Sequence, residues 1–146
     1  MFQDFLSRLT RPAPEQLTAT DARLALSALL VRVARSDGDY AATEVARIQS
    51  ILTARYGLGA TEVAALLKDA ETLESEAPDT VRFTRAIKDA VPHEDRLSIV
   101  EALWSVVLID GDRAHEEDTF LRLVSNLLGI SDMDNALARQ RVAAKG

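Results

Sequence analysis

The chain contains no cysteine and few aromatic residues, which make up 5% of its 146 residues. Without cysteine there are no disulfide bonds, no thiolate zinc sites and no cysteine nucleophiles. The same absence is typical of proteins kept in a reducing cytoplasm. The apolar residues are mainly Ala, Leu and Val. This composition favours helices over strands, because Ala and Leu lose little on entering a helix.

Long apolar runs and excess positive charge are also missing. No apolar run approaches the roughly 18 to 20 residues that a membrane-spanning helix needs, and Met1 to Pro14 has no signal-peptide core. The formal net charge is −6 and the isoelectric point about 4.9. Such a chain repels phosphate backbones, which excludes nucleic acid as the expected partner, and it is compatible with cations or basic protein surfaces. We expect a cytoplasmic protein without a transmembrane segment, and the sequence assigns no oligomeric state.

An amphipathic segment precedes the main body of the chain, at residues 1–19. Phe2, Phe5, Leu6 and Leu9 lie at helical spacing, with arginines nearby. Two interpretations fit this pattern. The segment is a short helix packed on the body, or it is a weak anchor for a protein partner or for the inner membrane surface.

The remainder, residues 20–146, has the apolar periodicity of helices throughout. In the first stretch Leu26, Leu29, Leu30 and Val33 form one stripe, and Thr20 is a plausible N-cap. The pattern predicts one all-α domain, a bundle of about seven helices, at about 21–37, 40–56, 61–76, 80–90, 93–110, 113–128 and 131–144. On the third of these, we expect a solvated charged face made of Lys68, Asp69, Glu71, Glu74 and Glu76.

The sequence repeats itself after a shift of 73 residues. The shared core is D-G-D-x-A-x-x-E, which begins at Asp37 in one copy and at Asp110 in the other. Apolar stripes flank both copies in the same phase. The matched apolar pairs are Leu30 and Leu103, Val33 and Val106, Ile48 and Leu121, and Ile51 and Val124. The repeat predicts a bundle with an internal pseudo-two-fold.

The acidic residues of each copy continue the apolar stripes, so they are expected to lie near the core-facing side. Charge is costly there unless it is paired or coordinated. In one interpretation the acids are structural: Asp39 and Asp112 cap the following helices, and Glu44 and Glu117 favour their N-terminal ends. In the other they bind a divalent cation, Ca²⁺, Mg²⁺ or Mn²⁺, which prefers several oxygen ligands in a small volume. The candidate ligands are then Asp37, Asp39, Glu44, Asp110, Asp112 and Glu117. A catalytic role ranks last, because no nucleophile or cofactor motif accompanies these acids, and we expect no enzyme.

The two copies, VARSDGDYAATEVARIQSIL and SVVLIDGDRAHEEDTFLRLVSNLLGI, resemble the TerB-like tellurite-resistance family. The resemblance runs from about Asp21 to the C-terminus. It implies an all-α, usually cytoplasmic protein associated with tellurite and other stress responses. It also implies that the six acidic residues above are the candidate metal ligands, and it implies no reaction. The leading hypothesis is therefore a non-enzymatic, stress-associated protein that binds divalent cations through paired acidic turns. The alternative is a helical scaffold that docks on a protein partner or on the inner membrane surface, with purely structural turns.

Overall fold

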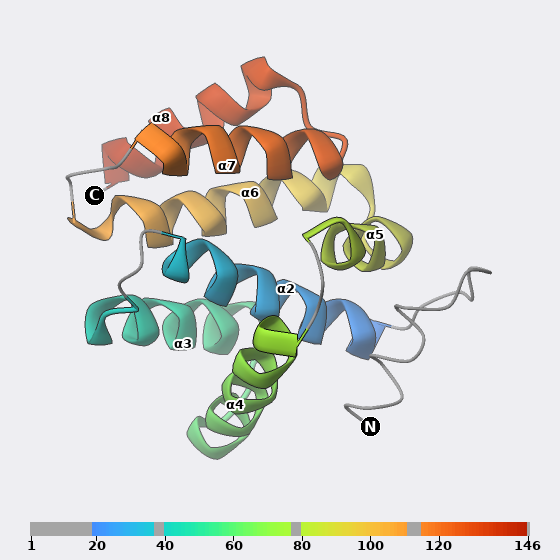
Figure 1. The fold of residues 1–146 in the computed structure, drawn as a ribbon, viewed down its shortest axis with the longest axis vertical. Coiled ribbons are helices and arrows are strands. Elements are labelled where there is room, and N and C mark those ends of the chain that lie inside the picture. The colour runs from blue at the N-terminus through green and yellow to red at the C-terminus, as the bar shows by residue number, and fades with distance from the viewer. Residues whose placement is uncertain (1–18, 37–39, 77–79, 111–114, 146) are drawn as a thin grey trace.

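The computed structural model describes residues 19–36, 40–76, 80–110 and 115–145. Within these ranges the chain is helical and contains no strand (Figure 1). The elements are α2 (Ala19–Arg35), α3 (Ala42–Tyr56), α4 (Ala60–Glu76), α5 (Thr80–Ala90), α6 (His93–Val107), the 3₁₀ turn η1 (Leu108–Asp110), α7 (His115–Leu127) and α8 (Asp132–Lys145). This confirms the predicted all-α bundle of about seven helices. Residues 1–18 of the predicted N-terminal segment lie outside the described ranges.

Several predicted helix boundaries need correction. Because α2 begins at Ala19, Thr20 is not its N-cap, and the helix ends before Asp37. Ser36 explains this ending: its N–H and its hydroxyl both donate to the carbonyl of Val33, at 3.2 and 2.7 Å. A serine that bonds to the backbone in this way competes with the regular helical pattern. The α6 helix stops three residues before Asp110, because its last turn tightens into η1.

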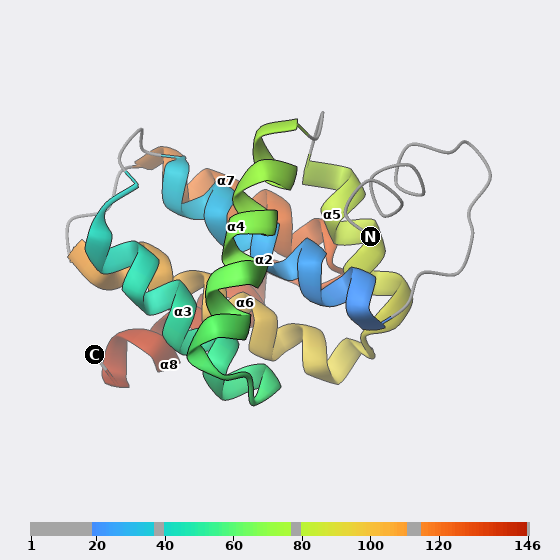
Figure 2. The ribbon, with the colours of Figure 1, turned by 90° about the horizontal axis from the view of Figure 1, so that it is seen from below.

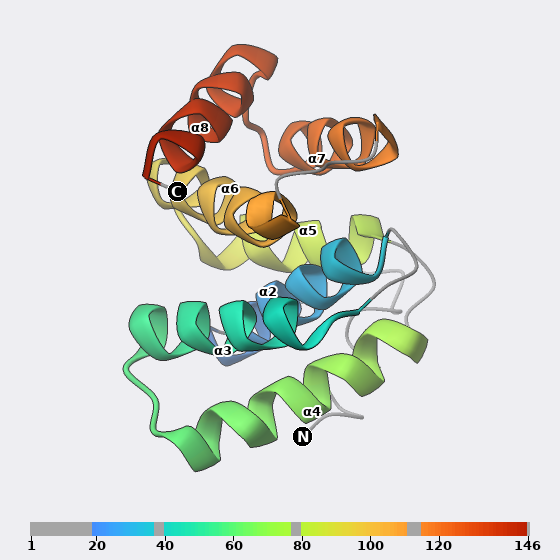
Figure 3. The same cartoon turned by 90° about the vertical axis from the view of Figure 1, so that its left-hand side faces the viewer.

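Helix α2 is the centre of the bundle. It packs against α3, α4, α5, α6 and α7, and it crosses the middle of the molecule in Figure 2. Every side chain from residue 25 to 31 is at most 1% exposed, including Ser27, whose hydroxyl donates to the carbonyl of Arg23 at 2.8 Å. A helix that is apolar on all sides is stable only when other elements surround it. The neighbouring helices are thereby arranged around α2, with α4 at one edge of the bundle and α7 and α8 at the other (Figure 3).

The internal repeat is visible as two helix pairs, α2–α3 and α6–α7. Three matched apolar positions are fully or almost fully buried in both copies: Leu30 and Leu103, Val33 and Val106, and Ile48 and Leu121. The second helix of each pair is followed by a glycine with positive φ, Gly57 at 65° and Gly129 at 78°. Glycine adopts this conformation without the steric cost that a Cβ atom would add.

A matched arginine also lies against the end of each pair. The guanidinium of Arg23 lies 4.8 Å from the ring centroid of Tyr56. Its counterpart Arg96 donates to the carbonyl of Leu128 at 2.7 Å. Tyr56 and Leu128 are themselves the matched residues before the two glycines. The repeat therefore extends from the apolar stripes to the polar contacts that close each pair.

Candidate acidic-turn site

Of the six predicted ligand residues, only Glu44 has a described side chain. Asp37, Asp39 and Asp112 lie outside the described residues. Asp110 ends η1, and Glu117 lies in α7, but the side chains of these two residues are also outside the described set. The described part of the site is therefore its surroundings, namely the ends of α2 and α6 and the beginnings of α3 and α7.

Glu44 faces the core at the beginning of α3. Its side chain is 5% exposed, as the phase of the apolar stripe predicts. Its Oε1 accepts a hydrogen bond from the backbone N–H of Ala41 at 3.0 Å. Ala41 is the N-cap of α3, so the predicted capping of this helix by Asp39 is wrong. Alanine has no side-chain acceptor, and among the described residues the side-chain bond of this cap comes from Glu44.

Tyr40 and Arg35 hold the chain on either side of the first acidic turn. The guanidinium of Arg35, at the end of α2, lies 5.0 Å from the centroid of the Tyr40 ring. The Tyr40 hydroxyl donates to Oε2 of Glu71 on α4 at 2.8 Å. Burial, followed by the hydrogen bond to the Glu71 carboxylate, raises the pKa of Tyr40 above its usual value of 10.0. The ring therefore stays neutral and links the turn to α4.

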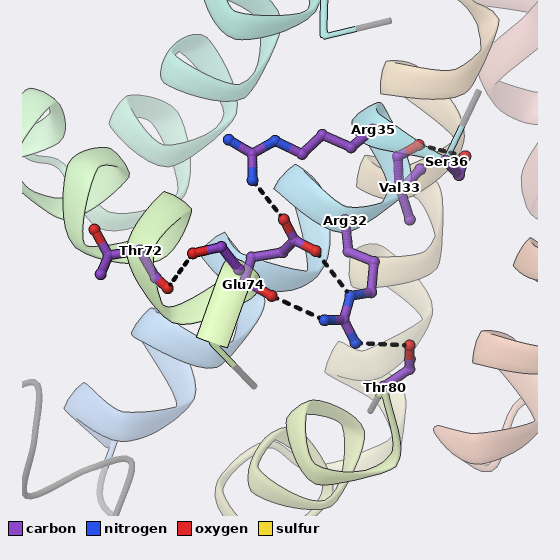
Figure 4. Close-up of polar contacts among 8 residues, drawn as sticks. Arg32, Val33, Arg35, Ser36, Thr72, Glu74 and Thr80 are labelled. Carbon is purple, nitrogen blue, oxygen red and sulfur yellow. Dashed lines mark hydrogen bonds and ion pairs between the residues drawn. The ribbon is translucent and has the colours of Figure 1, made fainter. Parts of the chain in front are cut away.

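Glu74 on α4 holds two arginines of α2 (Figure 4). Its Oε2 lies 3.1 Å from Nε of Arg32, and its Oε1 lies 2.6 Å from Nη1 of Arg35. Arg32 also donates to the Glu74 carbonyl at 2.9 Å and to the Thr80 hydroxyl at 3.3 Å. The Glu74 side chain is only 13% exposed. Its prediction as part of a solvated face is therefore wrong, because two arginines of a neighbouring helix cover it.

Sequence reasoning missed this cluster, although the sequence contains a signal for it. Arg32 and Arg35 are three residues apart, as are Glu71 and Glu74, so each pair lies on one helical face. What the sequence lacks is the information that α2 and α4 pack against each other. The cluster also has no equivalent in the second copy, where Ser105 and Leu108 occupy the positions of the two arginines.

The helix ends that flank the two acidic turns lie on the same side of the bundle. Helices α2 and α6 are in contact. Figures 1 and 3 show their C-terminal ends, and the N-terminal ends of α3 and α7, on one side of the molecule. The chain therefore enters and leaves both D-G-D sequences on that side. Among the residues that the structure describes, no three His, Asp or Glu side chains form a group that could hold a metal ion.

Comparison with known protein families gives a match to the family described as tellurite resistance protein TerB, over residues 23–140. The match covers more than half of the chain. The protein belongs to the TerB family. Comparisons with curated proteins and with solved structures gave no match.

The TerB match contains both helix pairs and both D-G-D sequences, and it falls inside the 20–146 domain predicted from the sequence. It gives the chain an association with tellurite resistance at the level of the family. None of the helices in the described ranges has the length and apolar content that a bilayer crossing requires.

Proposed function

We propose that this TerB-family protein is a non-enzymatic, stress-associated cytoplasmic module that binds a divalent cation through its two acidic turns. The proposed ligands are the carboxylates of Asp37, Asp39, Glu44, Asp110, Asp112 and Glu117. The proposed ions are Ca²⁺, Mg²⁺ and Mn²⁺, which take oxygen ligands.

The observation that carries this proposal is that the helix ends flanking both turns lie on one side of the bundle. A single D-G-D turn offers few carboxylates, whereas a cation of this class needs about six oxygens. Two turns that start from the ends of packed helices can share one ion. The carboxylate of Glu44, buried at the beginning of α3, adds support because it places oxygen donors beside the first turn.

The test is thermal unfolding of chelator-stripped protein with added Ca²⁺, Mg²⁺, Mn²⁺ or, as a softer ion, Zn²⁺. An ion at about 100 times its Kd should stabilise the fold by about 2.7 kcal/mol, which raises Tm by several degrees. The double variant Asp37→Asn/Asp110→Asn should lose this shift. The matched control Asp69→Asn/Asp89→Asn removes the same charge from exposed positions on α4 and α5 and should keep it. A shift of equal size in both double variants would refute the turn site.

The alternative is that the turns are structural and the chain is a helical scaffold, and one observation favours it: Glu44 already caps α3 through Ala41. Glu44→Gln separates the two functions, because the amide oxygen can still accept the Ala41 N–H. Under cation binding, this variant keeps its metal-free stability and its ion-induced shift becomes smaller. Under the structural alternative, added ions shift the Tm of neither protein, and the metal-free stability of the variant equals that of the wild type. In that case a partner or the inner membrane surface would be sought, and recovery of it should be lost on deleting residues 1–11.

A further inference from the structure

A groove of about 750 Å³ runs along α6, between α3 and α8. Its apolar lining comes from Ala102, Leu108 and Ile109 along the floor and from Val142 and Ala143 on the α8 side. The lining residues of α6 and η1 recur every three to four residues from Ser98 to Ile109. At 1.5 Å per residue this stretch is about 16 Å long, or roughly three turns of helix.

The charges on the groove are unevenly compensated. Glu101 lies 2.9 Å from Arg141, so its charge is paired. The hydroxyls of Ser98 and Ser105 donate to carbonyls of their own helix, at 2.6 and 2.7 Å. Two basic residues remain, both exposed and on opposite sides of the groove.

Arg47 on α3 and Lys145 on α8 line the groove from its two sides. Within the described part of the chain, neither side chain makes a hydrogen bond or an ion pair. The groove therefore presents two uncompensated positive charges on a chain whose net charge is −6. Local charge opposite in sign to that of the whole protein selects partners of complementary charge.

We propose that this groove binds an amphipathic helix of a protein partner, with an apolar stripe on the groove floor and acidic residues against Arg47 and Lys145. Three features support this occupant. Apolar side chains of α6, η1 and α8 line the groove and its hydroxyls are satisfied, its length matches three helical turns, and the unpaired charges on both sides are positive. Helices bind such grooves through residues spaced i, i+3, i+4 and i+7. None of the residues lining this surface is a proposed cation ligand, and the groove ends at Ile109, the residue before Asp110.

The test uses a fluorescein-labelled 15-residue peptide with leucine at every third or fourth position and glutamate on both sides of that stripe. Binding to the full chain is measured by fluorescence anisotropy. The variant Arg47→Glu/Lys145→Glu should raise the Kd by about tenfold or more, because both charge contacts become repulsive. The control Lys68→Glu/Lys88→Glu makes the same change in net charge at exposed positions on α4 and α5 and should bind like the wild type.

Two further measurements test the proposal. Ala143→Trp places a large side chain in the groove from an exposed position, so it should abolish binding while the circular dichroism and Tm stay unchanged. A peptide with lysine in place of glutamate should bind at least tenfold more weakly than the acidic peptide. Equal binding of the two peptides, or of the two double variants, would overturn the proposal. It would also be overturned if light scattering showed dimers that Ala143→Trp dissociates while the acidic peptide fails to bind, because the occupant would then be a second copy of this chain.

Discussion

Replacing Glu74 by alanine should lower the free energy of unfolding by about 2 kcal/mol. The carboxylate contacts two arginines, and their exposure decides what each contact contributes. The Arg32 side chain is 18% exposed and bonds to a carboxylate that is 13% exposed. Hydrogen bonds to charged groups contribute about 1.5 to 3 kcal/mol, and the lower end suits this partly shielded pair. The Arg35 side chain is 38% exposed, so solvent screening reduces its contribution to about 0.5 kcal/mol.

A loss of about 2 kcal/mol corresponds to a fall in Tm of roughly 4 to 8 °C for a domain of this size. Thermal and urea unfolding followed by circular dichroism would measure it. The matched control is Glu76→Ala, which removes an exposed glutamate from the last turn of the same helix and should change the stability by less than about 0.5 kcal/mol. If Glu74→Ala is no more destabilising than Glu76→Ala, the Arg32–Glu74–Arg35 cluster contributes nothing and the reasoning is refuted.

Three other substitutions test contacts elsewhere in the bundle. Tyr40→Phe should cost about 1 to 2 kcal/mol at neutral pH by removing the bond to Glu71. Because the pKa of Tyr40 is raised by burial, its contribution is complete below pH 10 and is lost as the pH rises further; urea unfolding at pH 7 to 11 should show the wild type and the variant converging. Asn135→Ala removes the acceptor of the Trp104 indole N–H, 2.8 Å away, and should cost about 2 to 3 kcal/mol, measured by the fluorescence of this single tryptophan. Gly57→Ala should cost about 1 kcal/mol in thermal unfolding, through its positive φ alone, because an added Cβ meets no atom within 4 Å.

The helices and their buried faces could be predicted from the sequence because both depend on local spacing. Leu26, Leu29, Leu30 and Val33 repeat with the helical period, and all four are buried. The phase of the α3 stripe predicted that Glu44, four residues before Ile48 and seven before Ile51, would face the core. The glycine at the end of each helix pair was also predictable, since a positive φ is a property of one residue.

The polar contacts between helices could not be predicted in this way. Glu74 has the local sequence of an exposed residue, and only the packing of α4 on α2 places it between two arginines. The end of α2 depends on similar detail. The apolar stripe continues in phase to Asp37, but the Ser36 hydroxyl takes the carbonyl of Val33 and ends the helix first. Periodicity identifies which face of a helix is apolar, whereas partner choice depends on the tertiary arrangement.

The central position of α2 has a consequence for how the chain folds during synthesis. This helix is the first of the described helices to be translated, yet the helices that cover it extend to α7. Some 70 residues separate the end of α2 from the end of α6, which takes roughly 4 to 14 s at the usual translation rate of about 5 to 20 residues per second. During that time α3, α4 and α5 can cover part of α2, but the face that α6 and α7 cover stays exposed. We therefore expect the nascent chain to be a substrate for ribosome-associated chaperones until α6 has emerged, and to complete its core in one late cooperative step.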